Sequence, residues 1–243
     1  NPVTEEMLKT GRNIPLDDSS SDVYYNSNGN KRTALMRKFH NTIKESLLYS
    51  ISTPGNTLFD TSMGKGGDLW KWKKMRLSFI FGIDLSKDNI ENHRDGACAR
   101  YLNMKKDYGR NIPDAVFIHG NSIKNLRDGS AFNTPRDKDM AMSILGTGIK
   151  DKKTLPPLVY NNFGVGDEGF DIVSAQFSLH YFFKNRTTLH GFLRNVSENC
   201  KFNGYFVGTC YDGAKIFELL KDKKQGEIVG KYGGKSGNDK LWE

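Results

Sequence analysis

The residues best suited to chemistry lie in one short stretch, LFDTSMGKGGDLWKW (58–72), which reads as an apolar strand, a glycine-rich turn and the start of a helix. Such a turn can hold a phosphate, a dinucleotide or an adenosyl group. A phosphate-binding loop needs a hydroxyl residue after its lysine, but Lys65 is followed by Gly66, which disfavours a nucleoside triphosphatase. A dinucleotide fingerprint needs a third glycine five residues after the first, where Leu69 stands.

An acidic residue at the end of the next predicted strand favours the adenosyl group. Asp84 closes LSFIFGID (77–84), about 20 residues after Gly64. A carboxylate at this spacing can accept hydrogen bonds from both hydroxyls of a ribose. A ribose without a pyrophosphate clamp indicates a ligand such as S-adenosylmethionine. The alternative is that Asp84 only caps the following helix, which is predicted to begin near Ser86.

A third group of candidate residues follows the strand predicted at FDIVSAQF (170–177). Aromatic and hydrogen-bonding side chains crowd the point where that strand should stop: Gln176, Phe177, His180, Tyr181, Phe182 and Phe183. Aromatic faces stack on bases, while His and Gln side chains read base edges. Taken singly, the phenylalanines read as core and His180 as a bystander. The cluster as a whole favours a binding site.

Alternating strands and helices must position these residues. Strands are predicted at 57–62, 77–84, 114–122, 170–177 and 204–210, and helices at 33–51, 67–75, 87–106, 187–200 and 213–223. This order predicts an α/β fold with a mostly parallel central sheet and helices on both faces. Ligands of such sheets bind beyond the carboxyl ends of the strands, which here carry Ser62 to Gly64, Asp84, Asn121 with Ser122, and Gln176.

Three segments depart from this simple alternation. The helix predicted at 33–51 has one apolar face, formed by Leu35, Met36, Phe39, Ile43 and Leu47, and Lys44 falls off that stripe. Gly96 weakens the helix predicted at 87–106. Residues 124–169 are polar and too long for an ordinary connection, so we expect an insertion with one short helix around Met140. The sequence contains no internal repeat.

Length and composition fit one large domain with appendages. The chain has 243 residues, of which 37% are hydrophobic, and no apolar run reaches the roughly 18 residues of a membrane span. Residues 1–32 are polar, carry no signal peptide and read as a linker from an upstream module, followed by one domain at 33–243. The chain does not begin with Met, so we expect it to be a piece of a longer polypeptide.

Charge and cysteine content narrow the classes of partner. A formal net charge of +8 favours an anionic partner such as RNA or a nucleotide, although solubility alone explains such an excess equally well. Cys98, Cys200 and Cys210 are scattered, and the sequence has neither CxxC nor HExxH. We therefore expect no disulfide framework and no metal site, in a reducing, cytoplasmic setting.

Several motifs together carry a family resemblance. LFDTSMGKGGDLWKWKK (58–74) resembles the adenosylmethionine loop of mRNA cap guanine-N7 methyltransferases, usually written DLGCGKGGDLxKW. FDIVSAQFSLHYFF (170–183) resembles the cap-binding segment of that family. MRKFHNTIKESLL (36–48) and LRNVSENCKFNGYFVGTCYDGAKIFELL (193–220) resemble its flanking elements. The chain is most similar in kind to the multifunctional capping enzymes of large cytoplasmic DNA viruses, and the resemblance covers residues 33 to about 225.

The resemblance implies a Rossmann-like class I S-adenosylmethionine-dependent methyltransferase fold and assigns roles to individual residues. The cofactor would be lined by Lys44, Ser62, Gly64, Asp84, Asn121, Gln176 and Tyr181. The cap would be contacted by Asn41, Lys65, Lys71, Arg100 and His180. The implied partners are 5′-capped RNA (GpppN) and upstream triphosphatase and guanylyltransferase modules of the same polypeptide. The implied location is the host cytoplasm, a viral factory or the virion, with no membrane and no metal.

The sequence departs from the family pattern at named positions. Ser62 replaces the first glycine of the loop, Asn121 stands where Asp is usual, and His40 replaces the first residue of an Asn pair. The family continues with further strands and a helix, whereas this sequence stops at NDKLWE. We therefore expect the C-terminal part of the family domain to be missing, either because the domain has been cut or because this is a short form.

The implied reaction needs no catalytic side chain in the usual sense. Guanine N7 carries a lone pair, so it can attack a sulfonium methyl without losing a proton. We expect neither a general base nor a covalent enzyme intermediate, and catalysis by proximity and orientation. Two alternatives remain: a non-catalytic module of the same fold that binds capped RNA or another capping subunit, and a methyltransferase for a small molecule or another RNA position.

Overall fold

The computed structural model describes residues 34–224 and 227. The predicted linker 1–32 and the end of the chain lie outside the described residues. The chain divides into two compact units, Asn1–Thr209 and Cys210–Glu243. The second unit contains α9 (Gly213–Leu220), which confirms the helix predicted at 213–223. None of the described helices is long and apolar enough to cross a bilayer.

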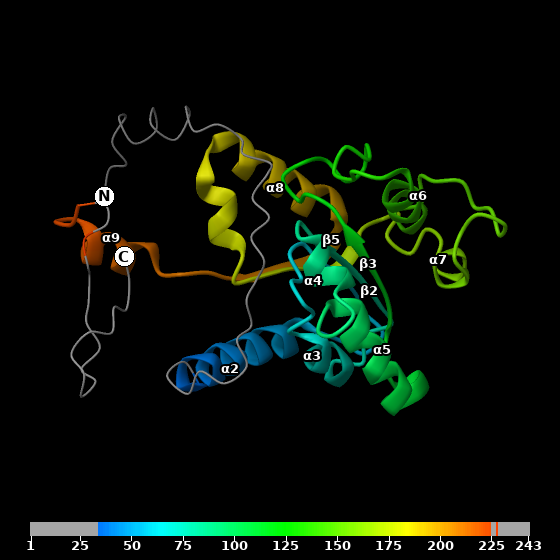
Figure 1. Ribbon diagram of the computed structural model, residues 1–243, viewed down its shortest axis with the longest axis horizontal. Coiled ribbons are helices and arrows are strands. Elements are labelled where there is room, and N and C mark those ends of the chain that lie inside the picture. Colours follow the sequence, from blue (N-terminus) through cyan, green and yellow to red (C-terminus); the bar gives the residue numbers. More distant parts are fainter. Residues whose placement is uncertain (1–33, 225–226, 228–243) are drawn as a thin grey trace. The chain divides into compact units, whose positions relative to one another are not determined.

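The first unit is built on a five-stranded sheet (Figure 1). Its strands are β1 (Thr57–Asp60), β2 (Phe79–Asp84), β3 (Asp114–His119), β4 (Phe170–Gln176) and β5 (Cys200–Thr209). They lie in the order β3-β2-β1-β4-β5, and every neighbouring pair is parallel. The predicted parallel sheet is therefore confirmed, and β5 begins at Cys200, earlier than the predicted 204.

The strand order creates a switch point between β1 and β4. The chain leaves β1 toward β2 and β3, then returns to β4 on the other side of β1 and continues to β5. The connections that follow β1 and β4 therefore run in opposite directions although the strands are neighbours. In open α/β sheets such a point opens a crevice at the carboxyl ends of the strands.

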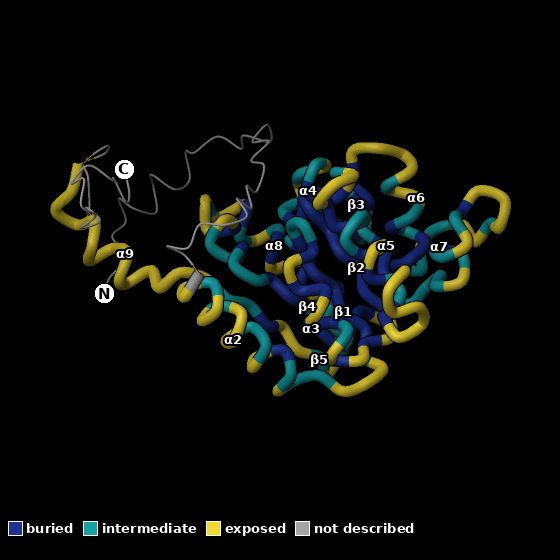
Figure 2. The backbone as a smooth tube through the Cα atoms, turned by 60° about the horizontal axis from the view of Figure 1, so that its bottom comes forward, coloured by how far each residue is buried: buried dark blue, intermediate teal, exposed yellow. Residues whose placement is uncertain are grey.

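Helices cover both faces of the sheet, as the sequence predicts (Figure 2). One face carries α2 (Ala34–Ile51), α3 (Leu69–Lys74), α4 (Lys87–Glu91) and α5 (Ala97–Tyr108), followed by the turn η2 (Gly109–Asn111). The other carries α6 (Pro135–Ile144), α7 (Pro157–Asn161) and α8 (Arg186–Asn199), the last preceded by η3 (Leu179–Lys184). Leu48, Trp72 and Tyr101 belong to the first core, and Ile144 and Phe192 to the second.

The three inner strands, β2, β1 and β4, are buried because their side chains alternate between these two cores, whereas most of the edge strand β5 is not buried. Along β2, Phe79, Phe81 and Ile83 point into the core beneath α6 to α8, while Ile80 points into the core beneath α2 to α5. All six residues of β2 are buried. A strand covered on both faces reads as a continuous apolar run, which is the pattern of FIFGID.

The prediction of a single helix at 87–106 is wrong, because the structure has two helices in this segment. α4 ends at Glu91 and α5 begins at Ala97. Gly96 is the N-cap of α5 with extended backbone angles (φ −66°, ψ 162°), which interrupt helical geometry. A Cβ at Gly96 would lie 2.7 Å from backbone atoms of Asn92. The glycine therefore permits a close return of the chain onto the end of α4.

Residues 124–169 contribute more to the fold than their polarity indicates. The helix expected around Met140 is confirmed as α6, and a second helix, α7, was not expected. Leu126, Ile144 and Val159 are buried in the core. The Arg127 guanidinium donates to four backbone carbonyls, among them Gly166 at 2.8 Å. This arginine fixes both ends of the segment to each other.

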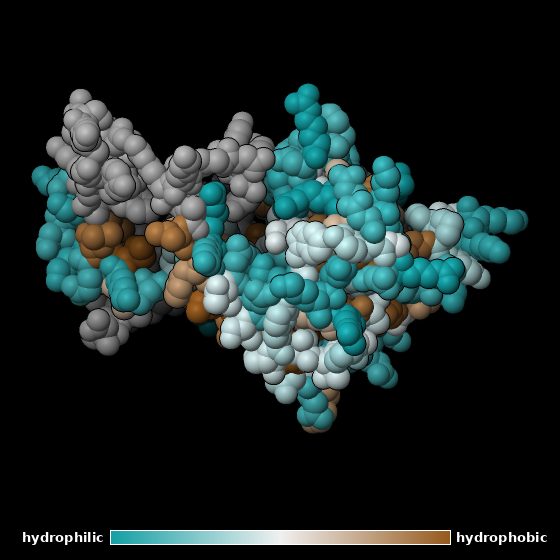
Figure 3. Space-filling view, turned by 90° about the horizontal axis from the view of Figure 1, so that it is seen from below, coloured by the Kyte–Doolittle hydropathy of each residue, from teal (hydrophilic) through white to brown (hydrophobic). Residues whose placement is uncertain are grey.

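The apolar stripe of α2 is exposed, and apolar residues (brown) reach the surface on the face of the molecule drawn in Figure 3. Leu35 is 82% exposed and Phe39 62% exposed, whereas Leu48 is completely buried. The side of α2 that faces the sheet also carries Lys44, whose side chain is only 13% exposed. The stripe is real in the sequence, but it does not mark the face of α2 that packs against the sheet.

Candidate active site

The turn after β1 forms the floor of the candidate site. Gly64 and Gly66 have positive φ angles of 55° and 69°, a conformation that favours glycine. A Cβ built on Gly64 would meet no atom within 4 Å, whereas one on Gly66 would lie 3.0 Å from Leu69. The backbone at Gly64 is therefore open to the close approach of a ligand.

Asp84 ties this turn to the end of β2. The side chain is buried, and its Oδ2 accepts a hydrogen bond from the Gly64 N–H at 2.7 Å. Its Oδ1 accepts from the Ser86 N–H at 2.9 Å and from Asn89 Nδ2 at 3.0 Å. The N-cap of α4 is Ser86, so Asp84 is not the cap of that helix. Ribose binding by Asp84 stays a prediction.

The end of β3 reaches across to the same turn. Asn121 is buried, and its Oδ1 accepts from the Ile123 N–H at 3.1 Å. Ser122 Oγ donates to the Thr61 carbonyl at 2.6 Å. The buried Asn195 of α8 donates to the Ser122 carbonyl at 2.7 Å and so holds this connection in place. Asn121 therefore lies at the same edge of the sheet as Gly64.

The end of β4 carries the predicted glutamine. Gln176 Nε2 donates to Ser174 Oγ at 3.2 Å, and its Oε1 accepts from Thr209 Oγ1 at 3.0 Å. The next residue, Phe177, has a positive φ of 55° although it is not glycine. Its ring centroid lies 4.2 Å from that of His40 on α2. Such backbone strain is common where a chain turns sharply at a functional site.

The aromatic cluster after β4 divides into core and surface. Phe182 is buried and stacks on Phe192 with ring centroids 3.9 Å apart, so for this residue the core interpretation is confirmed. Tyr181 is 70% exposed and Phe183 is 62% exposed. The rings of His180 and Tyr181 have centroids 4.3 Å apart. Burial lowers the pKa of His180, which favours the neutral imidazole.

A buried charge network joins three of the predicted residues. Asp68 lies 2.8 Å from Lys44 Nζ and 2.9 Å from Lys71 Nζ, and all three side chains are at least 87% buried. Lys71 Nζ also donates to Asn41 Oδ1 at 3.0 Å. One carboxylate therefore brings together a predicted cofactor residue on α2 and two predicted cap residues on α2 and α3.

The other two basic residues of the predicted cap set form a separate group. Arg100 Nη1 donates to the Lys65 carbonyl at 2.9 Å. Lys65 Nζ pairs with Asp95 at 2.9 Å and with Asp88 at 3.7 Å. Any phosphate that reaches Lys65 must therefore compete with carboxylates that already hold it.

Sequence reasoning missed Asp60 as a site residue. Asp60 closes β1 next to the glycine turn, is completely buried, and accepts from the Ser62 N–H at 3.1 Å. Burial, reinforced by the nearby Asp68 charge, raises its pKa to about 7. Its position at the end of an apolar strand was the available signal, the same one that identified Asp84. Asp68, within the helix predicted at 67–75, was not a candidate site residue either.

The twelve predicted site residues lie on α2, α3, α5 and η3, at the ends of β2 and β4, and in the turns after β1 and β3. The structure joins Gly64 to Asp84, Lys44 to Lys71 through Asp68, and Arg100 to Lys65. An open glycine backbone, a carboxylate and exposed aromatic rings at one edge can bind a nucleoside and present a second ring to it.

Comparisons with known proteins identify the family. The family model described as mRNA (guanine-N(7))-methyltransferase domain matches residues 19–235. The chain is 27% identical to a probable mRNA-capping enzyme of Acanthamoeba polyphaga mimivirus in an alignment of 257 residues that covers 100% of this chain and 20% of that protein. It is 30% identical to an mRNA cap guanine-N(7) methyltransferase of Saccharomyces cerevisiae, covering 79% of this chain and 36% of the relative.

Solved structures align with much of the chain at low sequence identity. A Pyrococcus horikoshii protein aligns with a TM-score of 0.48 at 18% identity, covering 82% of this chain and 67% of its own. An S-adenosylmethionine-dependent methyltransferase from Clostridium acetobutylicum aligns with a TM-score of 0.43 at 12% identity, covering 76% and 54%. The chain spans less than half the length of the curated relatives named above. Because the family model covers most of the sequence, the chain belongs to the mRNA (guanine-N7)-methyltransferase family.

Proposed function

We propose that this chain is the methyltransferase module of a capping enzyme, transferring a methyl group from S-adenosylmethionine to N7 of the guanine in a 5′ GpppN cap. The observation that carries the proposal is the hydrogen bond from the Gly64 N–H to the Asp84 carboxylate. It brings the glycine turn and the strand-ending acid to one point at the switch between β1 and β4, where a family member binds its nucleoside cofactor.

The residues at this edge fit the cofactor. The space above Gly64 is open, and the Asp84 carboxylate retains acceptor capacity on Oδ2, which accepts one hydrogen bond within the described residues. Seven residues would hold the cofactor: Lys44, Ser62, Gly64, Asp84, Asn121, Gln176 and Tyr181. When bound, S-adenosylmethionine supplies an electrophilic methyl group on a positively charged sulfur.

The protein then contributes position rather than proton transfer. N7 needs no deprotonation, so holding it in line with the methyl carbon and sulfur supplies up to roughly 7–11 kcal/mol of the barrier reduction. A neutral His180 can donate one hydrogen bond and accept another at the guanine edge. The exposed ring of Tyr181 can face the cationic sulfur, an interaction worth about 0.5–2 kcal/mol.

The triphosphate bridge of the cap would meet Lys65, Lys71 and Arg100. Lys71 is held by Asp68, and Lys65 by Asp95, so each ammonium is already oriented in the structure. A phosphate would replace Asp95 more easily than Asp68, since the Asp95 side chain is 51% exposed and the Asp68 side chain only 8%, although both lysines are equally buried. We therefore assign the first phosphate contact to Lys65 and an orienting role to Lys71.

The viral relative supports a proposal about the polypeptide and the cell compartment in which this chain acts. Its printed name is "Probable mRNA-capping enzyme", and this chain matches only 20% of its length. We propose that triphosphatase and guanylyltransferase modules lie upstream in the same polypeptide and supply the GpppN end. The location proposed for this reaction is the host cytoplasm, a viral factory or the virion.

Calorimetry followed by a transfer assay tests the proposal. S-adenosylhomocysteine should bind, and the protein should transfer a labelled methyl from S-adenosylmethionine to the cap analogue GpppA. Absence of cofactor binding would refute the assignment of the site. Cofactor binding without transfer would support the alternative of a non-catalytic module. Equal transfer to free GTP and to GpppA would indicate a small-molecule methyltransferase.

A further inference from the structure

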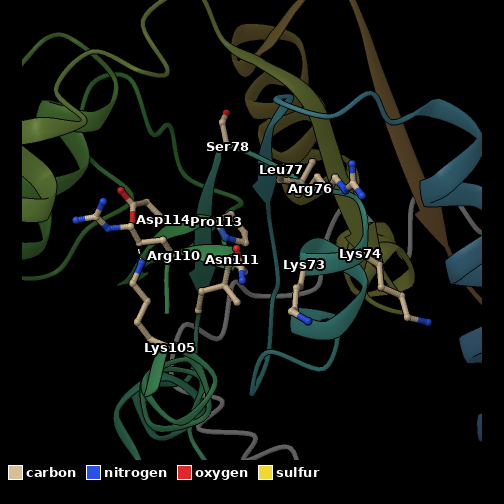
Figure 4. Close-up of a pocket in the computed structure, with 11 residues that line it drawn as sticks. Lys73, Lys74, Arg76, Leu77, Ser78, Lys105, Arg110, Asn111, Pro113 and Asp114 are labelled. Carbon is tan, nitrogen blue, oxygen red and sulfur yellow. Dashed lines mark hydrogen bonds and ion pairs between the residues drawn. The ribbon is translucent and has the colours of Figure 1, made fainter. Parts of the chain in front are cut away.

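A basic groove lies at the edge of the sheet opposite the candidate active site (Figure 4). Its volume is about 1110 Å³, and it is lined by residues that precede or begin β2 and β3, including Leu77, Ser78 and Asp114. Five basic side chains line it from two sides: Lys73, Lys74 and Arg76 from the end of α3, and Lys105 and Arg110 from the end of α5.

The positive charge of the groove is only partly neutralised. Lys105 pairs with Asp114 at 3.1 Å, and Lys74 pairs with Glu45 at 2.8 Å. Arg76 and Arg110 are exposed and form no ion pair within residues 34–224. Lysines in the last turn of a helix also stabilise its dipole, which accounts for Lys73, Lys74 and Lys105 but not for the two arginines beyond the helix ends.

Two exposed aromatic side chains contact Lys73, which lines the groove. Trp70 is 49% exposed and packs edge-on against the half-exposed Tyr108, with ring centroids 5.3 Å apart. Lys73 Nζ lies 3.9 Å from the Tyr108 ring centroid and 5.4 Å from that of Trp70. Exposed aromatic faces interleaved with basic groups are the pattern by which proteins bind single-stranded nucleic acid.

α3 connects the groove to the candidate active site. The helix begins directly after the glycine turn, carries Lys71 toward the buried Asp68, and ends with Lys73 and Lys74 at the groove. Six residues of β2 separate the two edges of the sheet by about 20 Å. A cap dinucleotide at the carboxyl edge would not reach the groove, whereas a longer RNA chain could follow α3 to it.

We propose that this groove binds the single-stranded transcript downstream of the cap, with Arg76 and Arg110 on its phosphates and Trp70 stacked on a base. The proposal rests on the proposed function for the identity of the RNA. It adds a second binding site, distinct from that for the cap, which makes affinity depend on RNA length. RNA is favoured over an acidic protein because the aromatic faces beside the groove fit bases.

The test is fluorescence anisotropy of the full chain with an unstructured 20-nucleotide RNA carrying a 5′ triphosphate. The double variant Arg76→Gln/Arg110→Gln should bind this RNA about tenfold more weakly at low salt. The slope of log affinity against log salt should fall by about 1.4, since each phosphate contact on a single strand contributes about 0.7. Trp70→Ala should lower affinity at least about fivefold, as expected for one lost stacking contact.

Matched variants separate this site from general charge effects. Lys152→Gln/Lys153→Gln removes the same charge from exposed positions of the 124–169 segment and should bind RNA normally, as should Arg76→Lys/Arg110→Lys. Native affinity in the glutamine double variant, or an equal loss in the Lys152/Lys153 control, would overturn the proposal. A third result would also overturn the proposal: Trp70→Ala binds RNA normally, and heparin binding depends on the same two arginines. That result would indicate a general polyanion-binding surface.

The RNA-binding experiment can be interpreted separately from the methyl-transfer assay. Methyl transfer to GpppA should be unchanged in Arg76→Gln/Arg110→Gln, because the dinucleotide does not reach the groove. If the native protein binds RNA through the groove but methylates no cap, the proposed function fails and the groove stands. If the protein methylates GpppA but the arginine substitutions do not affect RNA binding, the proposal that the groove binds RNA is refuted and the proposed function stands.

Discussion

The carboxylate of Asp84 has one observed role within the protein and one proposed role toward a ligand. It accepts hydrogen bonds from the Gly64 and Ser86 backbone N–H groups, and it is the predicted acceptor for the ribose hydroxyls. We expect Asp84→Ala to abolish binding of S-adenosylhomocysteine in calorimetry, because two charge-assisted hydrogen bonds to the ligand are lost and the glycine turn is released.

A neighbouring variant controls for local stability. Ser86→Ala removes the N-cap of α4 and should cost about 1 kcal/mol of folding free energy while leaving cofactor affinity unchanged. If Ser86→Ala lowered the affinity for the cofactor as much as Asp84→Ala does, the role of Asp84 would be only to shape the start of α4.

We assign His180 to the guanine of the cap rather than to the cofactor. Its imidazole lies beside Tyr181 after β4, and burial lowers its pKa. We expect His180→Ala to leave affinity for S-adenosylhomocysteine nearly intact and to reduce methyl transfer to GpppA by about 10²-fold, because the guanine is no longer held in line. Equal loss of cofactor affinity in His180→Ala and Asp84→Ala would show that the two subsites have been divided wrongly.

Asp60 makes stability depend on pH. Its pKa is raised by burial to about 7 in the folded protein, above the ordinary value of 3.8. Between these values the folded state binds the proton more tightly, so the contribution is complete below pH 4 and is lost as pH rises through 7. The loss amounts to about 4 kcal/mol at most, from three pKa units at 1.36 kcal/mol each.

Urea unfolding at pH 5 and pH 8 measures this contribution. Asp60→Asn keeps an acceptor for the Ser62 N–H but cannot ionise. We expect the native protein to lose more stability than Asp60→Asn between the two pH values. The same change in both proteins would mean that Asp60 ionises as freely in the folded state as in the unfolded chain.

Which residues could be identified from sequence depended on their position in elements. Asp84, Asn121 and Gln176 were found because each ends or follows an apolar strand, and strand ends meet at one edge of a parallel sheet. Asp68 was not recognised as a site residue because its role depends on an ion pair with Lys44, which lies 24 positions earlier on another helix. Contacts between distant segments leave no mark in local spacing.

At the scale of elements, α2 is attached to the sheet domain by charge as well as by Leu48. Asp68 stands at the start of α3 and holds Lys44 of α2 and Lys71 of α3. We expect Asp68→Ala to lower the free energy of unfolding by roughly 3–5 kcal/mol in urea titration, because two buried ammonium groups lose their counter-charge.

The same pair of helices offers an exposed control. Glu45 of α2 pairs with Lys74 of α3 at 2.8 Å in contact with solvent. Glu45→Ala should cost under about 1 kcal/mol, since exposed pairs contribute little. Similar losses for Glu45→Ala and Asp68→Ala would mean that the buried network does not fix α2.

Elements were predicted well where apolar periodicity matched burial and poorly where backbone geometry decided. The buried inner strands follow from continuous apolar runs such as that of β2. The break between α4 and α5 depends on extended angles at Gly96, which a period-3.6 count does not detect. The orientation of α2 was not predictable, because a stripe of apolar residues does not say which partner covers it.

At the scale of the whole molecule, the two proposed binding sites lie at opposite edges of the parallel sheet. The carboxyl edge gathers residues suited to a nucleoside and a purine, while the amino edge carries the basic groove formed by α3 and α5. Part of the net charge of +8 is concentrated in this groove, beside the path that we propose for a capped transcript.

Salt should distinguish the ligands of this molecule. Three basic residues on the cap triphosphate give a slope of log affinity against log salt of about −2, so the affinity for GpppA should fall by roughly tenfold or more between 50 and 200 mM salt. S-adenosylhomocysteine carries no phosphate and is the matched control, whose affinity should stay nearly constant. Calorimetry with both ligands in the same buffers measures the difference. A cap affinity that is as insensitive to salt as that of the control would show that Lys65, Lys71 and Arg100 do not contact the triphosphate, since counterion release accompanies every such contact.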